Sequence, residues 1–298
     1  MLDDLTMPST PLVSVIMPSL NQAKYIEASV DSVLGQDYRN VELIIADGGS
    51  NDGTVQLLQR IATEDSRLRW FSEPDTGPAN ALNKALARVR GTLVGWLNSD
   101  DLYTPGAVLR AVAALEANPS WLMLYGHGQH IDGEDKVLNN YPTLPPSTPV
   151  IRFAEGCFIC QPTVLSRRSM WLLLGKLDES LKAVFDFEYW LRAFLAFPDR
   201  IGFVNAVQAQ TRLHDECITL RLRRTVTVEA MQVLARHLGC APKLWLLNYV
   251  SDLLTVPSSQ QNVGNLKEHV NDTLAVVKPW LKADDLRELE SQLSEMLK

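Results

Sequence analysis

Short apolar runs alternate with amphipathic stretches along the first hundred residues of the chain. The apolar runs end in polar residues and cover 12–19, 41–50, 68–77 and 92–101. Between them, apolar residues recur every three or four positions, and this spacing predicts helices over 23–35, 54–61 and 78–90. Strands that alternate with helices predict an α/β fold with a mainly parallel sheet and right-handed crossovers.

The second half of the chain has a different pattern. The broad apolar face of 183–197 predicts a helix. After residue 224, further helices are expected over 228–238, 243–254, 266–281 and 284–298, with a loop over 254–264. Such a helical region either covers the sheet, forms a dimer or lies on a membrane surface. The basic run 220–224 faces phosphate, lipid headgroups or solvent.

The composition is that of an ordinary globular protein. Of the 298 residues, 46% are hydrophobic and 21% are charged, which allows one large domain or two modest ones with a sizeable core. The net charge of −7 provides no basic field that would attract nucleic acid. An anionic ligand therefore needs a metal ion, a helix N-terminus or a few placed cations.

The sequence also bears on location. Its acidic start lacks the basic and apolar regions of a signal peptide, and no apolar stretch reaches the ~20 residues of a membrane span. We therefore expect a cytoplasmic protein, with peripheral contact at the inner face of a membrane left open. The four cysteines fit a reducing compartment, and we interpret them as small buried hydrophobic residues because "CFIC" has no second C-x-x-C.

Polar residues gather where the predicted strands end. They are Asp75 and the segments 18–21, 47–49 and 98–101. A lone "SDD" is typical of a polar turn with a helix cap. In a parallel sheet, however, strands end on one edge, and ligands bind where the strand order reverses. Several acidic strand ends on one edge therefore predict a ligand site.

The chemistry of that edge favours a nucleotide and a hard metal ion. Paired carboxylates and amides suit Mg²⁺ or Mn²⁺, which commonly sit between carboxylates and phosphates. A single Asp at a strand end can accept hydrogen bonds from a base or a ribose. The chain has neither a G-x-x-x-x-G-K-[ST] loop nor a G-x-G-x-x-G motif after its first strand, which counts against P-loop NTPases and dinucleotide dehydrogenases.

Several motifs resemble the family 2 glycosyltransferases of the GT-A fold. They are "VSVIMPSLNQAKYIEASVDSVLGQDY", "ELIIADGGSNDGT", "SEPDTGPANALNKALARVRGTLVGWLNSDD" and "FDFEYWLRA", in the family's order over residues 12 to about 215. The resemblance implies a Rossmann-like, mainly parallel sheet flanked by helices, in a GT-A domain over 1–224 with a nucleotide-sugar half (12–104) and an acceptor half (105–224). The helical C-terminal region, 225–298, lies beyond the resemblance.

The resemblance also assigns the donor site. It implies that Asp47 holds the nucleotide base and that "Asn98-Ser99-Asp100" occupies the family's D-x-D position, with Asn in place of the first acid. Gly48 stands where many members have a second Asp. The expected nucleotide-binding residues are Pro18, Ser19, Asn21, Asp47, Gly48, Asp75, Asn98 and Ser99. The expected ligands of Mg²⁺ or Mn²⁺ are Asp100, Asp101 and His214.

A base is expected because an acceptor hydroxyl is a poor nucleophile. By resemblance this base is Asp186, with Glu188 as the alternative. The residues alone equally suit a helix cap at Asp186 and a favourable charge at Glu188. The segment "QAQTRLHDE" (208–216) resembles the strand and the R-x-H motif that follow this helix in many relatives, which implies that Arg212 neutralises phosphate and that His214 reaches the metal or diphosphate. By the same resemblance, Gln161 in "GCFICQP" is expected to contact the acceptor.

The sequence thus predicts a metal-dependent inverting glycosyltransferase. It would move a sugar from a nucleotide diphosphate donor, a UDP-sugar being favoured, to a hydroxyl of a glycan or lipid-linked acceptor. Surface polysaccharide assembly is the setting that the family suggests. Asn98, Gly48 and Phe185 leave a non-catalytic nucleotide-sugar-binding subunit as an alternative. A nucleotidyltransferase is a further alternative, but "PSLNQAKY" lacks its glycine-rich basic loop.

Overall fold

The computed structural model describes residues 10–255 and 263–298, which form two compact units. The sheet unit comprises Met1–Pro146, as far as it is described, with Phe158–Glu179 and Ala196–Leu213. The helical unit comprises Ser147–Cys157, Ser180–Leu195 and His214–Lys298. This division differs from the predicted boundary at residue 224, because two earlier segments of the chain pack with the C-terminal helices.

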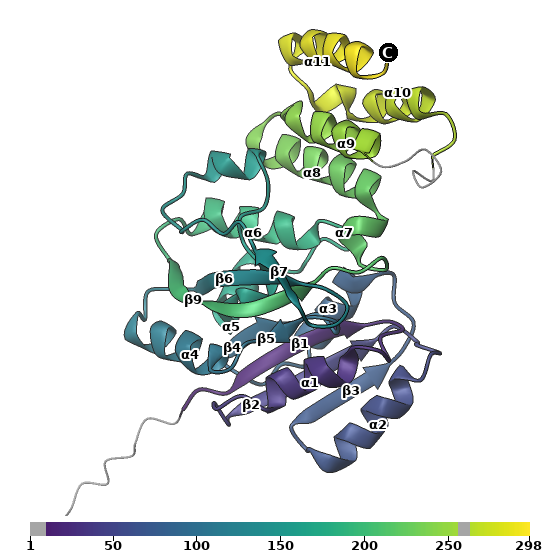
Figure 1. Ribbon diagram of the computed structural model, residues 1–298. Coiled ribbons are helices and arrows are strands. Elements are labelled where there is room, and N and C mark those ends of the chain that lie inside the picture. The colour runs from purple at the N-terminus through teal and green to yellow at the C-terminus, as the bar shows by residue number, and fades with distance from the viewer. Residues whose placement is uncertain (1–9, 256–262) are drawn as a thin grey trace, which may run out of the picture. The chain divides into compact units, whose positions relative to one another are not determined.

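The sheet unit contains one mixed sheet (Figure 1), with the strand order β3-β2-β1-β4-β8-β6-β9-β5 and with β7 paired to β6. Its first four strands are parallel, as the alternating pattern predicts. They are β1 (Val13–Ser19), β2 (Val41–Asp47), β3 (Leu68–Ser72) and β4 (Leu93–Trp96). Every residue of β1, β2 and β4 is buried, which explains why these strands appear as apolar runs.

Helices cover this parallel half on both faces. Right-handed crossovers place α1 (Ile26–Leu34) and α2 (Thr54–Glu64) on one face, because β1, β2 and β3 follow each other in one direction. The chain then returns past β1 to β4, which places α3 (Pro78–Leu86) on the other face. The strand order therefore reverses between β1 and β4.

The rest of the sheet is mixed. It contains β5 (Leu102–Tyr103), β6 (Met123–Ile131), β7 (Val137–Asn140), β8 (Leu165–Arg167) and β9 (Ile201–Arg212). The β6–β9 pair is parallel, whereas β8 runs antiparallel to β4 and β6. The strand expected within 208–216 is the end of β9, which stops at Arg212. Helices α4 (Ala107–Ala117) and α5 (Arg168–Leu174) complete the sheet unit.

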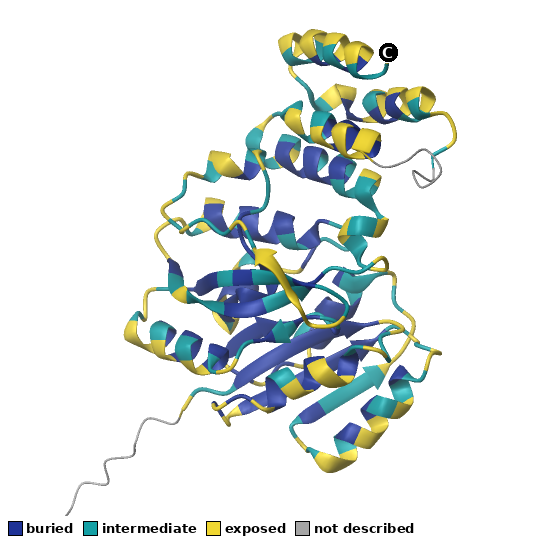
Figure 2. Ribbon diagram, viewed as in Figure 1, coloured by how far each residue is buried: buried dark blue, intermediate teal, exposed yellow. Residues whose placement is uncertain are grey.

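The helical unit has its own core. Its elements are η1 (Val150–Ala154), α6 (Phe185–Ala196), α7 (Ile218–Arg221), α8 (Arg223–Leu238), α9 (Leu244–Thr255), α10 (Leu266–Val277), η4 (Lys278–Trp280) and α11 (Ala283–Met296). Each predicted helix is present. Buried residues of α8–α11, among them Met231, Val250, Val270 and Leu289, pack together. Figure 2 shows buried positions alternating with exposed ones along these helices. The loop predicted over 254–264 falls largely outside the described residues.

The cysteines and the apolar helices bear on two further expectations. All four cysteines are free thiols, but only Cys160 is buried and the other three are half-buried, so the expectation of burial holds for one of them. Within the described residues, no helix is long and apolar enough to cross a membrane.

Candidate active site at the carboxyl ends of the parallel strands

The predicted donor residues lie at the reversal of strand order. Ser19 at the end of β1 is the register partner of Asp47 at the end of β2, and Gly48 N donates to Ser19 O at 2.8 Å. The turn that begins at Asn98 follows β4, the other neighbour of β1. The topology thus brings the strand ends singled out in the sequence to one edge, as predicted, and this is where open α/β sheets bind ligands.

Asp47 organises the turn after β2. It is 1% exposed, and its Oδ2 accepts from Gly49 N at 3.1 Å, Ser50 N at 2.9 Å and Ser72 Oγ at 2.6 Å. Its Oδ1 accepts from the Ser50 hydroxyl. The carboxylate therefore holds the turn between β2 and α2 and ties it to β3.

Asn21 joins the ends of β1 and β2 from the other side. Its Oδ1 accepts from Asn51 N at 3.0 Å, and its own N donates to Ser50 Oγ at 2.7 Å. The residue has φ +53°, a left-handed conformation that Asn tolerates better than most residues. Asp52 extends the same link, since its Oδ2 accepts from Ala23 N at 2.9 Å.

Gly48 lies directly against the carboxylate of Asp75. A Cβ at this position would lie 2.6 Å from Asp75 Oδ2. Asp75 is half-buried and its Oδ1 accepts from Gly77 N at 2.8 Å. A side chain at position 48 would therefore require the carboxylate of Asp75, which comes from the segment after β3, to move.

The amide of Asn98 is the centre of a buried network. Its Oδ1 accepts from Trp96 Nε1 at 3.0 Å, and its Nδ2 donates to Asp101 Oδ2 at 3.0 Å and to Gln161 Oε1 at 3.2 Å. Gln161 Nε2 in turn donates to Trp96 O at 2.8 Å. An Asp at position 98 would lack the amide N–H₂ that now donates to both Asp101 and Gln161, so this network favours Asn at position 98.

The neighbouring carboxylates Asp100 and Asp101 differ in their surroundings. Asp101 is 2% exposed and, besides Asn98, accepts from Arg212 N at 2.9 Å through Oδ1. Its burial, together with the charge of Asp100, raises the pKa of Asp101 well above its ordinary value. Asp100 is half-buried. Of the two, Asp100 therefore fits the role of a metal ligand better.

Arg212 fastens this turn to the end of β9. Its Nε donates to the carbonyl oxygen of Asp100 at 2.8 Å, and its Nη1 lies 2.8 Å from Asp132 O and 2.5 Å from Asp135 Oδ1. The guanidinium also lies over the ring of Tyr25, 4.6 Å from its centroid. Arg212 is 3% exposed, so in this structure it organises the turn. The expected phosphate contact stays a prediction.

The donor set suits a divalent cation only in combination with a substrate. Among the described residues, no three His, Cys, Asp or Glu side chains gather closely enough to hold a metal ion. A single carboxylate such as Asp100 together with diphosphate oxygens is nevertheless a common way to hold Mg²⁺. The oxygen atoms of Asp100 and of a bound diphosphate would thus suit Mg²⁺ or Mn²⁺. His214, the third expected metal ligand, belongs to the helical unit, and its role stays a prediction.

The predicted base lies in the helical unit, in the first turn of α6. Asp186 is half-buried, and partial burial raises the pKa of its carboxyl group to about 6. Its Oδ1 accepts from Phe187 N at 2.7 Å. Glu188, the alternative base, is 3% exposed and ion-paired, with Oε1 lying 2.8 Å from Arg192 Nε and 3.1 Å from His237 Nε2.

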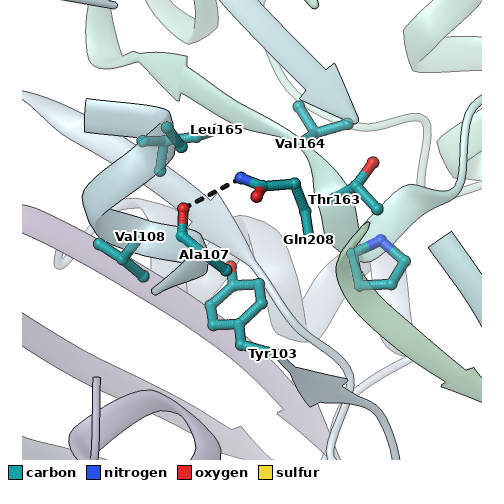
Figure 3. A pocket seen from close by; sticks show the side chains of 9 residues that line it. Tyr103, Ala107, Val108, Thr163, Val164, Leu165 and Gln208 are labelled. Carbon is teal, nitrogen blue, oxygen red and sulfur yellow. Dashed lines mark hydrogen bonds between the residues drawn. The ribbon is translucent and has the colours of Figure 1, made fainter. Parts of the chain in front are cut away.

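The sheet unit also contains a pocket. Figure 3 shows Gln208 Nε2 donating to Ala107 O at 3.0 Å across this pocket. Its lining is mainly apolar: Tyr103, Ala107, Val108, Ala111, Pro162, Thr163, Val164, Leu165 and Gln208. None of the predicted site residues lines it. We interpret it as a packing gap between α4 and the sheet.

Sequence reasoning missed several residues that shape the site. Ser50 and Ser72 hold Asp47, and Trp96 holds Asn98. Ser50 stands in the quoted "DGGSNDGT" motif, so its position offered a signal. Trp96 looked like a strand residue, and only the fold shows that its indole donates to the amide two residues later.

Comparisons with known proteins agree with this architecture. A model of the family described as "Glycosyl transferase family 2" matches residues 14–171. Chondroitin synthase of Escherichia coli is 28% identical over 223 residues, which cover 74% of this chain and 32% of that protein. Hyaluronan synthase of Pasteurella multocida is 30% identical over 139 residues, covering 47% of this chain and 14% of that protein. The chain thus spans about a third or less of the length of these relatives.

Solved structures show the same fold at low sequence identity. S. aureus TarS 1–349 in complex with UDP-GlcNAc has a TM-score of 0.62 and 17% identity, over 95% of this chain and 92% of that one. The mannosyltransferase PcManGT from Pyrobaculum calidifontis, in complex with GDP-Man and Mn²⁺, has a TM-score of 0.59 and 18% identity, over 98% and 82%. Because the family model covers more than half of its residues, the chain belongs to glycosyltransferase family 2.

Proposed function

We propose that this chain transfers a sugar from a nucleotide diphosphate donor to an acceptor hydroxyl, with inversion at the anomeric carbon. The observation that carries the proposal is the network at the reversal of strand order. There, the turn 98–101 is joined by hydrogen bonds to Gln161 and Arg212, which come from distant parts of the chain. Membership of family 2 supports sugar transfer as the chemistry of this site.

The donor nucleotide would bind along the ends of β1, β2 and β3. Asp75 presents a half-buried carboxylate beside Gly48, and we assign it and Asp47 to recognition of the base or ribose. Pro18, Ser19, Asn21 and Ser99 would line the same site. A uridine nucleotide is favoured, since TarS structures contain UDP and UDP-GlcNAc.

The diphosphate would lie at Asp100 together with Mg²⁺ or Mn²⁺. When bound, the cation would offset negative charge on the leaving diphosphate. The backbone of this turn is held by hydrogen bonds among Asn98, Asp101 and Arg212, and these bonds fix the position of the Asp100 backbone. The PcManGT complex with Mn²⁺ supports a divalent cation in this fold.

Asp186 would accept the proton of the acceptor hydroxyl as that oxygen attacks the anomeric carbon. Its pKa of about 6 leaves it ionised at neutral pH and close enough to neutrality to act as a base. Glu188 is engaged with Arg192 and His237, which favours Asp186 of the two. One base is sufficient for a single inverting displacement.

Glycan assembly is the proposed setting. Relatives named as chondroitin and hyaluronan synthases support a glycan acceptor, free or lipid-linked. The second candidate function is a nucleotide-sugar-binding subunit without turnover. It is favoured by Asn98, whose amide oxygen is bound to Trp96 and whose neighbour Asp101 is buried.

Thermal-shift screening of nucleotide sugars with and without Mn²⁺, followed by UDP release from the best donor, tests the proposal. Stabilisation that requires Mn²⁺ together with UDP release supports a transferase. Stabilisation without any turnover, in the presence of glycan acceptors, would favour the binding subunit. No stabilisation by any nucleotide sugar would contradict both.

A further inference from the structure

A buried carboxylate of α8 binds the segment that leads into α6. Glu229 is 8% exposed. Its Oε1 accepts from Lys182 N at 2.7 Å, and its Oε2 accepts from Ala183 N at 2.9 Å and from Val184 N at 3.3 Å. Residues 182–184 immediately precede α6, which begins at Phe185. One side chain thus binds three successive backbone N–H groups at the entry to this helix.

These contacts are strong for a physical reason. Successive backbone N–H groups that point to one side form a concave anion site, and the N-terminus of a helix adds positive potential. The carboxylate of Glu229 accepts hydrogen bonds from these N–H groups and places negative charge near the positive end of the helix. Hydrogen bonds to an ionised acceptor are about twice as strong as those between neutral groups. Because the bonds are to the backbone, Glu229 determines the path of the chain and not only the rotamer of a side chain.

A second contact joins the same two helices. His237, eight residues after Glu229 on α8, lies 3.1 Å from Glu188 Oε1 on α6. Arg192 completes this ion pair from the next turn of α6. Asp186 lies between the two contacts along the chain, two residues after the segment that Glu229 binds and two residues before Glu188. Both sides of the proposed base are therefore held by α8.

We propose that Glu229 is a positioning residue, which fixes the entry to α6 and through it the carboxylate of Asp186. The inference rests on the proposed function of Asp186 as the base. It assigns a role to the region after residue 224 that resemblance to the family does not reach: α8 supports the catalytic helix.

The test compares Glu229→Gln, Glu229→Asp and the control Glu295→Gln in the full-length chain. Gln places an amide N–H₂ against backbone N–H donors and removes the charge, while Asp keeps the charge on a shorter side chain. Glu295 is exposed on α11 and controls for the loss of one carboxylate from the helical unit. UDP release from UDP-GlcNAc with Mn²⁺, or from the donor chosen by the screen, gives kcat and KM.

We expect Glu229→Gln to lower kcat roughly 10- to 100-fold, as a displacement of about 1 Å does in a positioned catalytic group. The KM for the donor should stay within about twofold, because the donor residues lie in the sheet unit. Glu229→Asp should lie between Gln and wild type, and Glu295→Gln should match wild type. In an Asp186→Asn background, Glu229→Gln should cause little further loss, because it would act through a base that is already absent.

Two results would overturn the inference while the proposed function survives. One is a Glu229→Gln variant that melts at a lower temperature but keeps the wild-type kcat per folded molecule. The other is an equal fold-loss in the wild-type and Asp186→Asn backgrounds, which would place the effect of Glu229 elsewhere. If Asp186→Asn alone retains normal turnover, the base assignment is wrong and the positioning role falls with it.

Discussion

The turn after β4 and the first turn of α6 each contain two nearby carboxylates, and in each pair one is committed to holding the fold. Asp101 is bound by neutral donors, the backbone of Arg212 and the amide of Asn98. Glu188 is bound by the guanidinium of Arg192 and by the imidazole of His237. The other member, Asp100 or Asp186, is half-buried in both cases. Because the contacts of Asp101 and Glu188 hold the fold, we assign the proposed chemistry to the other member of each pair.

The largest expected effect separates Asp186 from Glu188. Asp186→Asn keeps the side-chain shape but cannot accept a proton, so single-turnover transfer should fall roughly 10²–10⁴-fold while donor affinity is retained. Glu188→Gln should instead lower the melting temperature, because it removes one partner of a buried ion pair. Rapid-quench measurement of transfer, with calorimetry of both variants, checks this. Exchanged outcomes would make Glu188 the base.

The same contrast applies to Asp100 and Asp101. Asp100→Asn, or excess EDTA with the wild type, should weaken UDP binding about 10- to 100-fold, because the proposed cation would hold the diphosphate on a chain with a net charge of −7. Asp101→Asn should mainly reduce stability, since it places an amide N–H₂ group against hydrogen-bond donors such as Arg212 N and Asn98 Nδ2.

Isothermal titration of UDP with Mn²⁺, and again with EDTA, measures the first effect. Equal affinity in the two titrations would contradict the metal assignment. A melting temperature for Asp101→Asn equal to that of the wild type would show that its hydrogen bonds contribute little to the turn.

A pH profile sharpens the role of Asp186 further. A base must be ionised, and the pKa of Asp186 is about 6, so transfer should rise with pH through about 6 and then level off. About one pH unit below that value, the rate should be roughly tenfold lower than on the plateau. Stopped-time assays of UDP release between pH 5 and 8 measure it, and Asp186→Asn should lack this limb of the profile.

The sequence predicts the parallel half of the sheet well because each of its strands is buried on both faces and ends in polar residues. Because parallel strands end on one edge of a sheet, the sequence alone predicts that Asn21, Asp47 and Asn98 lie near one another. The individual roles at that edge are harder to predict. Whether Asp47 faces a ligand or its own turn depends on Ser50 and Ser72, whose hydroxyl directions no pattern encodes.

The helical unit shows where sequence reasoning stops. Its helices are predicted by their apolar spacing, but the partners of α6 are not. Glu229 is more than forty residues from the segment that it binds, and no motif links the two. Likewise, 147–157 and 180–195 join the C-terminal helices through packing, so a boundary drawn where the resemblance ends does not match the compact units.

The smallest effect concerns Asp75 and Asp47, which repeat the same contrast at the nucleotide end of the site. Asp75→Asn keeps the acceptor for Gly77 N but can turn the oxygen beside Gly48 into a donor group. If that oxygen accepts a hydrogen bond from the nucleotide, UDP affinity should fall about three- to tenfold, the usual value of one hydrogen bond, with an unchanged melting temperature.

Asp47→Ala should weaken UDP binding without altering metal preference. It should also lower the melting temperature, because Asp47 holds the turn after β2. Titration of UDP and differential scanning calorimetry separate these outcomes. Wild-type UDP affinity in a folded Asp75→Asn variant would remove Asp75 from the nucleotide site and leave base recognition to Asp47. Wild-type UDP affinity in a folded Asp47→Ala variant would remove Asp47 from the site and leave base recognition to Asp75.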